Sequence, residues 1–253
     1  MLEGKKILVA GAGGLLGSQV VKTLLEQNAT VIASDNNYEG MQKRLIERDV
    51  DTKTQRLLLE QLNLNDEQQV IAFFERMDIL DGSVNCSYPR NKAYGKHFFD
   101  VKLTDFNDNV SLHLGSSFLF MQQCAVLFLK NRKPFSLVNI ASIYGVIAPD
   151  FDIYKDTPMT MPVEYAAIKS GLIHLSKYVT KYISDSNFRV NTVSPGGIYD
   201  NQQQAFLNAY QQKSFGKGML NVHDVTGSIL FLLSEHSRYV NGQNLIVDDG
   251  FSL

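Results

Sequence analysis

The feature that most constrains the fold is an apolar run, a glycine-rich turn and a helix-like segment at the start of the chain. Residues 6–10 are almost continuously apolar, as in a strand buried on both faces of a parallel sheet. The turn Gly11–Gly17 follows, and a helical pattern continues to about residue 28. Such glycines let the backbone approach a pyrophosphate, and the helix N-terminus offers free N–H groups to phosphates. The motif favours dinucleotide binding, although an ordinary strand-to-helix turn can have the same pattern.

The second predicted strand, residues 30–34, ends at Asp35. An acidic residue about 20 positions beyond the glycine turn is placed to hydrogen-bond the ribose hydroxyls of adenosine. A 2′-phosphate at that point would meet like charge, and the glycine turn contains no arginine or lysine. Asp35 therefore predicts NAD as the cofactor, not NADP.

Tyr165 and Lys169 are four residues apart and share a face of a predicted helix. A nearby ammonium group favours the phenolate, so we expect Lys169 to lower the tyrosine pKa from roughly 10. Ser142 follows an apolar strand at 136–141, which places its hydroxyl at the carboxyl end of that strand. The Tyr-x-x-x-Lys spacing also arises by chance, and its weight here comes from the dinucleotide motif that precedes it.

Strand-like and helix-like segments alternate along the chain, which predicts a parallel sheet with helices on both faces. The expected fold is a doubly wound α/β Rossmann fold with seven parallel strands, in one domain over residues 1–253. Strands are expected near 5–10, 30–34, 55–62, 79–86, 135–141, 188–194 and 243–247, and helices near 15–28, 38–48, 66–77, 103–131, 162–184, 200–212 and 221–234. The segments near 87–100, 145–161 and 197–220 are expected to be loops that face the substrate.

Composition narrows the classes of function. The net charge is −2 and there is no long basic block, so nucleic acid is not an expected partner. No apolar run approaches the roughly 18 residues of a membrane span, and the N-terminus leaves no room for a signal peptide. A cytoplasmic protein with no membrane partner is therefore expected. Cys86 and Cys124 are expected to be buried free thiols, and no metal site is expected.

Together these motifs resemble the short-chain dehydrogenase/reductase family over nearly the whole chain. The resemblance rests on Gly11–Gly17, Asp35, Val84-Asn85-Cys86-Ser87, Ser142, Tyr165 with Lys169, Pro195-Gly196, Asn241-Gly242-Gln243 and Val247-Asp248-Asp249-Gly250. Residues 85–91 and 111–115 are also similar to the bacterial branch found with flagellin and surface-polysaccharide sugar biosynthesis.

The resemblance implies an NAD-dependent oxidoreductase that interconverts a secondary alcohol and a ketone. Ser142 would orient the substrate oxygen, Tyr165 would exchange its proton, and Lys169 would lower the tyrosine pKa and hold the nicotinamide ribose. The implied cofactor-binding residues are Gly11, Gly14, Leu15, Leu16, Gly17, Asp35, Asn63, Leu64, Asn85, Cys86, Ser87, Tyr165, Lys169, Pro195, Gly196 and Ile198. A homodimer or homotetramer built on the helices near 103–131 and 162–184 is also implied.

The chain departs from the family pattern at four positions. His113 stands where many members have an asparagine that supports a proton-relay water, and it could either replace that function or simply pack. Asn63 replaces the usual acid after the third strand, Cys86 replaces an asparagine, and Leu15 replaces a glycine. The interval between Ser142 and Tyr165 is longer than usual, which predicts either a lid or pocket wall or a plain surface insertion.

The loop after the fourth strand suggests a class of substrate. Arg90, Lys92, Lys96 and His97 concentrate positive charge there, and arginine binds phosphate through two parallel hydrogen bonds. We expect an anionic sugar, either a sugar phosphate or a nucleotide sugar, held by Arg90 and Lys92 together with Ser142 and Tyr165. A solvated basic loop is the alternative. Two other functions remain open: an NADPH-dependent reductase of a 3-oxoacyl or other carbonyl substrate, and a noncatalytic NAD-sensing protein.

Overall fold

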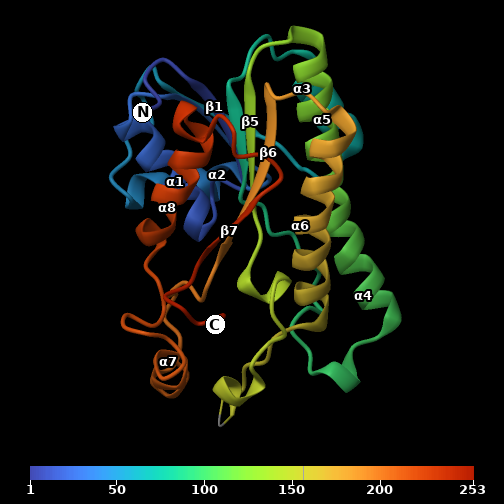
Figure 1. Cartoon of the computed structure of the whole chain (residues 1–253), viewed down its shortest axis with the longest axis vertical. Coiled ribbons are helices and arrows are strands. Elements are labelled where there is room, and N and C mark those ends of the chain that lie inside the picture. Colours follow the sequence, from blue (N-terminus) through green and yellow to red (C-terminus); the bar gives the residue numbers. More distant parts are fainter. Residues whose placement is uncertain (156) are drawn as a thin grey trace.

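The computed structural model describes residues 1–155 and 157–253 and has a seven-stranded, fully parallel sheet at its centre (Figure 1). The strand order is β3-β2-β1-β4-β5-β6-β7, which confirms the predicted doubly wound fold. The strands are β1 (Lys6–Ala10), β2 (Thr30–Asp35), β3 (Leu57–Gln61), β4 (Gly82–Asn85), β5 (Phe135–Ile140), β6 (Phe188–Pro195) and β7 (Asn244–Val247). β3 and β4 are shorter than predicted, because residues 55, 56 and 79–81 lie in the turns that lead into them.

Helices cover both faces of the sheet. They are α1 (Leu15–Glu26), α2 (Tyr38–Glu47), α3 (Glu67–Glu75), α4 (Leu103–Val110), α5 (Ser116–Asn131), α6 (Val163–Ile183), α7 (Gln204–Gln211) and α8 (Val222–Leu233). α1, α2 and α8 pack on one face around one apolar cluster, and α3, α5 and α6 pack on the other around a second cluster (Figure 1). The central strands are buried on both sides, which explains their continuous apolar sequences.

The strand order reverses between β1 and β4, and this switch point positions the site. β1 pairs with β2 on one side and with β4 on the other, and β4 pairs with β5. The segments that begin at Gly11, Cys86 and Ala141 therefore leave the sheet together, at the carboxyl ends of its parallel strands. Ligands of such sheets bind in the crevice outside the carboxyl ends of the strands at this point.

The helix predicted over residues 103–131 is interrupted. α4 ends at Val110, a π-helical turn spans Ser111–Gly115, and α5 begins at Ser116. Such wider turns inside helices often occur at functional sites. Here the turn carries His113, whose carbonyl accepts a hydrogen bond from the Ser116 hydroxyl at 3.2 Å.

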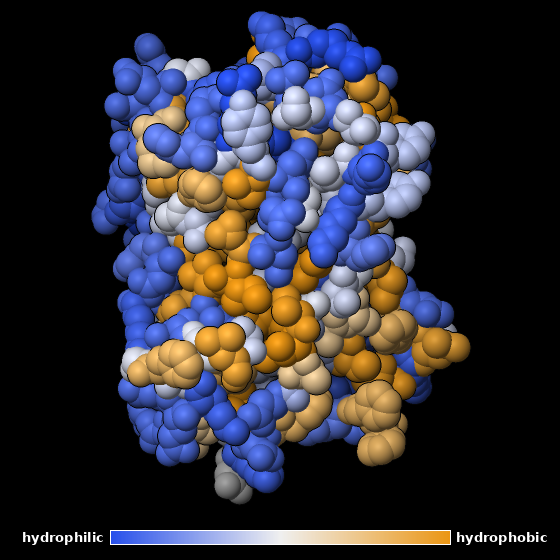
Figure 2. All heavy atoms as spheres, viewed as in Figure 1, coloured by the Kyte–Doolittle hydropathy of each residue, from blue (hydrophilic) through white to orange (hydrophobic). Residues whose placement is uncertain are grey.

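The same stretch, Leu103–Asn131, is by length and composition apolar enough to cross a membrane, contrary to the expectation from the sequence. Its most apolar window is 56% buried inside the molecule, as in a core helix, so the stretch is weak evidence for a membrane segment. Figure 2 shows apolar side chains on the surface where α4 lies, and also across the middle of the same face.

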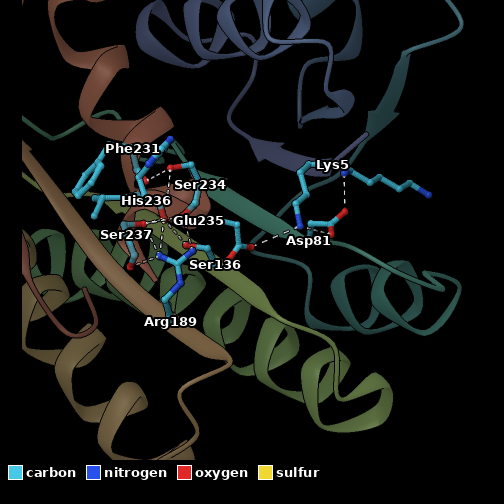
Figure 3. A network of polar contacts seen from close by, with 11 residues as sticks. Lys5, Asp81, Ser136, Arg189, Phe231, Ser234, Glu235, His236 and Ser237 are labelled. Carbon is cyan, nitrogen blue, oxygen red and sulfur yellow. Dashed lines mark hydrogen bonds and ion pairs between the residues drawn. The ribbon is translucent and has the colours of Figure 1, made fainter. Parts of the chain in front are cut away.

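A polar network lies at the opposite edge of the sheet from the switch point (Figure 3). The buried Arg189 guanidinium donates hydrogen bonds to the carbonyl oxygens of Leu232, Ser234 and Ser237 at 2.9, 3.1 and 2.9 Å. Arg189 thereby caps the C-terminus of α8, where a cation is favoured by the helix dipole. The Arg189 guanidinium is therefore used in hydrogen bonds within the fold and is not available to a ligand.

Candidate active site

A cavity of about 850 Å³ opens at the carboxyl edge of the sheet and runs from the glycine turn to α7. Most residues predicted to bind cofactor or substrate line it. These are Gly11, Gly14, Leu15, Leu16, Gly17, Asp35, Asn63, Leu64, Cys86, Ser87, Arg90, Ser142, Tyr165, Lys169, Pro195, Gly196 and Ile198. Three predicted residues are outside this lining, namely Asn85, His113 and Lys92.

Close backbone approach at the glycine turn explains why Gly11 is required. Its φ is +75°, and a Cβ there would lie 2.7 Å from the backbone nitrogen of Ser87. Gly14 is the N-cap of α1 and supplies no side-chain hydrogen bond, so no side-chain cap occupies the first N–H groups of this helix. An uncapped helix N-terminus beside a tight turn suits a pyrophosphate.

Asp35 is fixed next to this turn. One carboxylate oxygen accepts a hydrogen bond from the Gly13 N–H at 2.9 Å and the other accepts from the Asn37 N–H at 3.0 Å. Among the described residues, the cations that line the cavity are Arg90 and Lys169, and neither belongs to the glycine turn or to β2. The turn, the uncapped helix and the carboxylate therefore fit a dinucleotide.

Ser142, Tyr165 and Lys169 come together in the middle of the cavity. Gly145 makes this possible, since a Cβ there would lie 2.7 Å from the backbone carbon of Lys169, so the turn after β5 packs directly on α6. The Ser142 hydroxyl is close enough to the Tyr165 phenol to lower the pKa of Tyr165. The Lys169 ammonium lies 5.5 Å from the centre of the Tyr165 ring and donates to the Ile140 carbonyl at 2.7 Å.

The expected lowering of the tyrosine pKa by Lys169 is not found in the structure. Burial raises the pKa of Tyr165, and the nearby Ser142 hydroxyl only partly offsets this rise. Burial also lowers the pKa of Lys169 to about 7, so near neutral pH this amine is charged only part of the time. The prediction considered the attraction between the two groups and left out the cost of desolvating both.

His113 lies outside the cavity lining but contacts two residues that line the cavity, Lys169 and Tyr88. Its side chain is buried, and its Nε2 is 3.5 Å from Lys169 Nζ. The centre of its ring lies 5.2 Å from the centre of the Tyr88 ring. Burial, followed by the charges of Lys169 and Arg90, lowers the pKa of His113 to about 2. A neutral imidazole can accept a hydrogen bond from Lys169, so His113 does more than fill space.

The loop after β4 is anchored to α4 and α6. The Asn91 N–H donates to Asn109 Oδ1 at 2.9 Å, and the Asn109 amide group donates to the buried Glu164 at 3.3 Å. Lys96 forms an ion pair with Asp105 at 3.0 Å. Part of the basic character of this loop is therefore used in contacts within the fold.

Arg90 is the cation that this loop contributes to the cavity, because Lys92 lies outside the lining. The Arg90 guanidinium packs over the Tyr88 ring, with its central carbon 4.8 Å from the ring centre. Arg90 has no carboxylate partner among residues 1–155 and 157–253. The Tyr88 ring also packs against the Tyr165 ring, with the two ring centres 5.6 Å apart. Tyr88 was not predicted, although its position directly after β4 was a usable signal.

The segment between Ser142 and Tyr165 forms a wall of the cavity. Tyr154 lines the cavity and packs on Phe206 of α7, with their ring centres 5.2 Å apart. An ion pair between Asp150 and Lys213 at 3.0 Å holds the same segment to the chain beyond α7. Of the two alternatives left open by the sequence, a pocket wall describes the structure and a plain surface insertion does not.

Comparison with known proteins defines the class. Residues 11–252 match the family model described as enoyl-(acyl carrier protein) reductase. The chain is 38% identical over the full length of both proteins to the post-translational flagellin modification protein A of Campylobacter coli. It is 25% identical to the 7alpha-hydroxysteroid dehydrogenase of Bacteroides fragilis, over 99% of this chain and 95% of the relative.

A solved structure agrees with these sequence matches. The short-chain dehydrogenase of Leptospira borgpetersenii, crystallised with bound NAD+, is 32% identical and superposes with a TM-score of 0.88, covering 100% of this chain and 94% of the other. The chain therefore belongs to the short-chain dehydrogenase/reductase family of oxidoreductases. It shares with that family both the Rossmann fold and the nucleotide-binding turn.

The burial of His113 predicts a pH dependence of stability. The unfolded chain takes up a proton on this histidine below about pH 6.5 and the folded protein does not, so folding stability is lost as the pH falls. Urea unfolding at pH 6.5 and 4.5 should show that the wild type loses about 2 to 3 kcal/mol more than the His113→Asn variant. Equal losses in the two proteins would mean that His113 is protonated in the folded state.

Proposed function

We propose that this protein is an NAD-dependent oxidoreductase that interconverts a secondary alcohol and a ketone on an anionic sugar. The observation that carries the proposal is the convergence of Ser142, Tyr165 and Lys169 in the cavity that also contains the glycine turn and Asp35. A noncatalytic NAD-sensing protein would need the turn and the carboxylate but would have no use for the other three side chains.

The protein's own residues handle the proton in this reaction. The Ser142 hydroxyl holds the substrate oxygen, and the Tyr165 hydroxyl exchanges a proton with that oxygen as the carbon is oxidised or reduced. NAD, when bound, supplies the ring that accepts or donates the hydride. Lys169, held by the Ile140 carbonyl and His113, is placed to favour the phenolate whenever its amine is charged.

The sugar substrate is supported by two independent observations. The relative from Campylobacter coli, matched over its full length, is described as a flagellin modification protein. Arg90 offers the cavity a guanidinium without a carboxylate partner among the described residues, which suits a phosphate. We therefore favour a sugar phosphate or nucleotide sugar used in modifying flagellin or surface glycans.

An NADPH-dependent reductase of 3-oxoacyl substrates is the alternative, and it is favoured by a relative from Thermotoga maritima, a 3-oxoacyl-[acyl-carrier-protein] reductase that is 28% identical over 98% of both chains. The charges near the cofactor argue against it. The Asp35 carboxylate lies beside the glycine turn, where a 2′-phosphate would meet like charge, and no described cation lines that end of the cavity.

We also propose that the protein works in the cytoplasm as a homodimer or homotetramer. The support is apolar surface around α4 and α5, where Phe98, Phe99, Leu103, Phe118 and Val126 are exposed. Exposed apolar side chains concentrated in this way are characteristic of protein interfaces.

The first prediction from this function is a preference for NAD over NADP. At 4 Å and an effective dielectric constant of 20, a phosphate beside Asp35 would cost about 4 kcal/mol, which is roughly a thousandfold in affinity. Water and local rearrangement reduce that cost, so calorimetric titration should give NAD an advantage of tens- to hundredsfold. Equal affinities for the two cofactors would exclude the role given to Asp35.

The second prediction concerns Tyr165→Phe. The ring still packs but cannot exchange a proton, so kcat should fall by roughly a hundredfold or more, the usual contribution of general acid–base catalysis. The affinity for NAD should stay near that of the wild type, which serves as the check on folding. A variant that keeps more than about a tenth of wild-type kcat would rule out this role for the tyrosine.

The third prediction concerns Arg90→Ala. Loss of a charge-assisted hydrogen bond of about 1.5 to 3 kcal/mol should raise KM for a sugar phosphate roughly ten- to a hundredfold, with little change in NAD affinity. Lys92→Ala is the matched control, because it removes a positive charge from the same loop outside the cavity. An unchanged KM in the Arg90 variant, or equal turnover of uncharged sugars, would refute the anionic substrate.

A further inference from the structure

The end of the cavity beyond Tyr165 has a chemical character that the dinucleotide site and Arg90 do not explain. Its walls are aromatic side chains from three separate segments: Tyr144 in the turn after β5, Tyr154 in the segment before α6, and Phe206 with Tyr210 on α7. These rings form a third apolar cluster, closed from below by Phe251, whose ring centre lies 4.3 Å from that of Tyr210.

The hydroxyl groups on this wall differ in how they are used. The Tyr210 hydroxyl accepts a hydrogen bond from the Gly197 N–H at 2.6 Å, so it is committed to the backbone that follows β6. The Tyr144 and Tyr154 hydroxyls meet each other at 3.4 Å, near the outer limit for a hydrogen bond. Among the described residues, neither of these two hydroxyls has another hydrogen-bond partner.

The hydroxyl groups of Tyr144 and Tyr154 are both neutral near neutral pH. Burial raises the pKa of Tyr154 to about 12 and also raises the pKa of Tyr144. A neutral phenol can donate one hydrogen bond and accept others. Two such groups, weakly hydrogen-bonded to each other and carried by side chains that line a cavity, can improve their hydrogen bonding by binding a hydroxyl group of a ligand.

We infer that Tyr144 and Tyr154 form a specificity site for a hydroxyl group of the substrate, while the rings beside them pack against its C–H groups. This inference rests on the proposed function and makes it more specific. The substrate then has two recognised parts on either side of Tyr165: an anionic group at Arg90 and a hydroxyl-bearing carbon at the tyrosine pair.

The site also explains why an acyl chain would be a poor substrate. A cavity built to hydrogen-bond a substrate hydroxyl rejects an analogue without it, because its own buried polar groups are left unpaired. An alkyl chain would fill the aromatic pocket and leave both phenols with only their long mutual contact.

The test measures binding, so that it does not depend on knowing the natural substrate. Glucose 6-phosphate, each of its monodeoxy analogues and uncharged sorbitol are titrated by calorimetry into the protein saturated with NADH. We expect the wild type to bind the parent sugar phosphate roughly tenfold more tightly than one of the deoxy analogues, the gain from one hydrogen bond of about 1.4 kcal/mol. In the Tyr144→Phe, Tyr154→Phe double variant this preference should disappear.

The exposed Tyr182, which stacks on Tyr178 at the surface, provides the matched control. Tyr182→Phe should keep the wild-type preference, and unchanged NADH affinity in the double variant shows that it is folded. If the double variant keeps the preference, or if the wild type binds none of these polyols, the inference is wrong. If sorbitol binds as well as the phosphates and the double variant loses that binding, the anionic substrate is refuted and the tyrosine site stands.

Discussion

The hydrogen bond from Lys169 to the Ile140 carbonyl is the interaction on which the arrangement of the site depends. It joins α6 to the carboxyl end of β5 at 2.7 Å, and Gly145 allows the two segments to approach. From that anchor the ammonium reaches His113 on the π-helical turn and faces the ring of Tyr165. One buried amine thus links α6, the carboxyl end of β5 and the π-helical turn.

Much of the fold and of the dinucleotide site could be predicted from the sequence, because these features depend on local patterns. Apolar runs mark strands that are buried on both faces, and the spacing of Gly11–Gly17 and Asp35 reflects backbone geometry that is the same in every such sheet. The features that were missed depend on contacts between side chains in the folded protein. The ion pair of Lys96 with Asp105 and the position of Tyr88 against Tyr165 cannot be derived from spacing along the chain.

The wrong prediction for the pKa of Tyr165 has the same origin. The sequence reveals that a lysine lies near a tyrosine, but the cost of burying both groups depends on everything packed around them. Near neutral pH the phenol is protonated and the amine is partly neutral.

The account is tested most directly by a crystal structure of the protein with NAD+ bound. It predicts the adenosine ribose at Asp35, the pyrophosphate at the N-terminus of α1, and the nicotinamide ring beside Tyr165 and Lys169. A dinucleotide bound outside this cavity, or a nicotinamide ring directed away from Tyr165, would contradict the account.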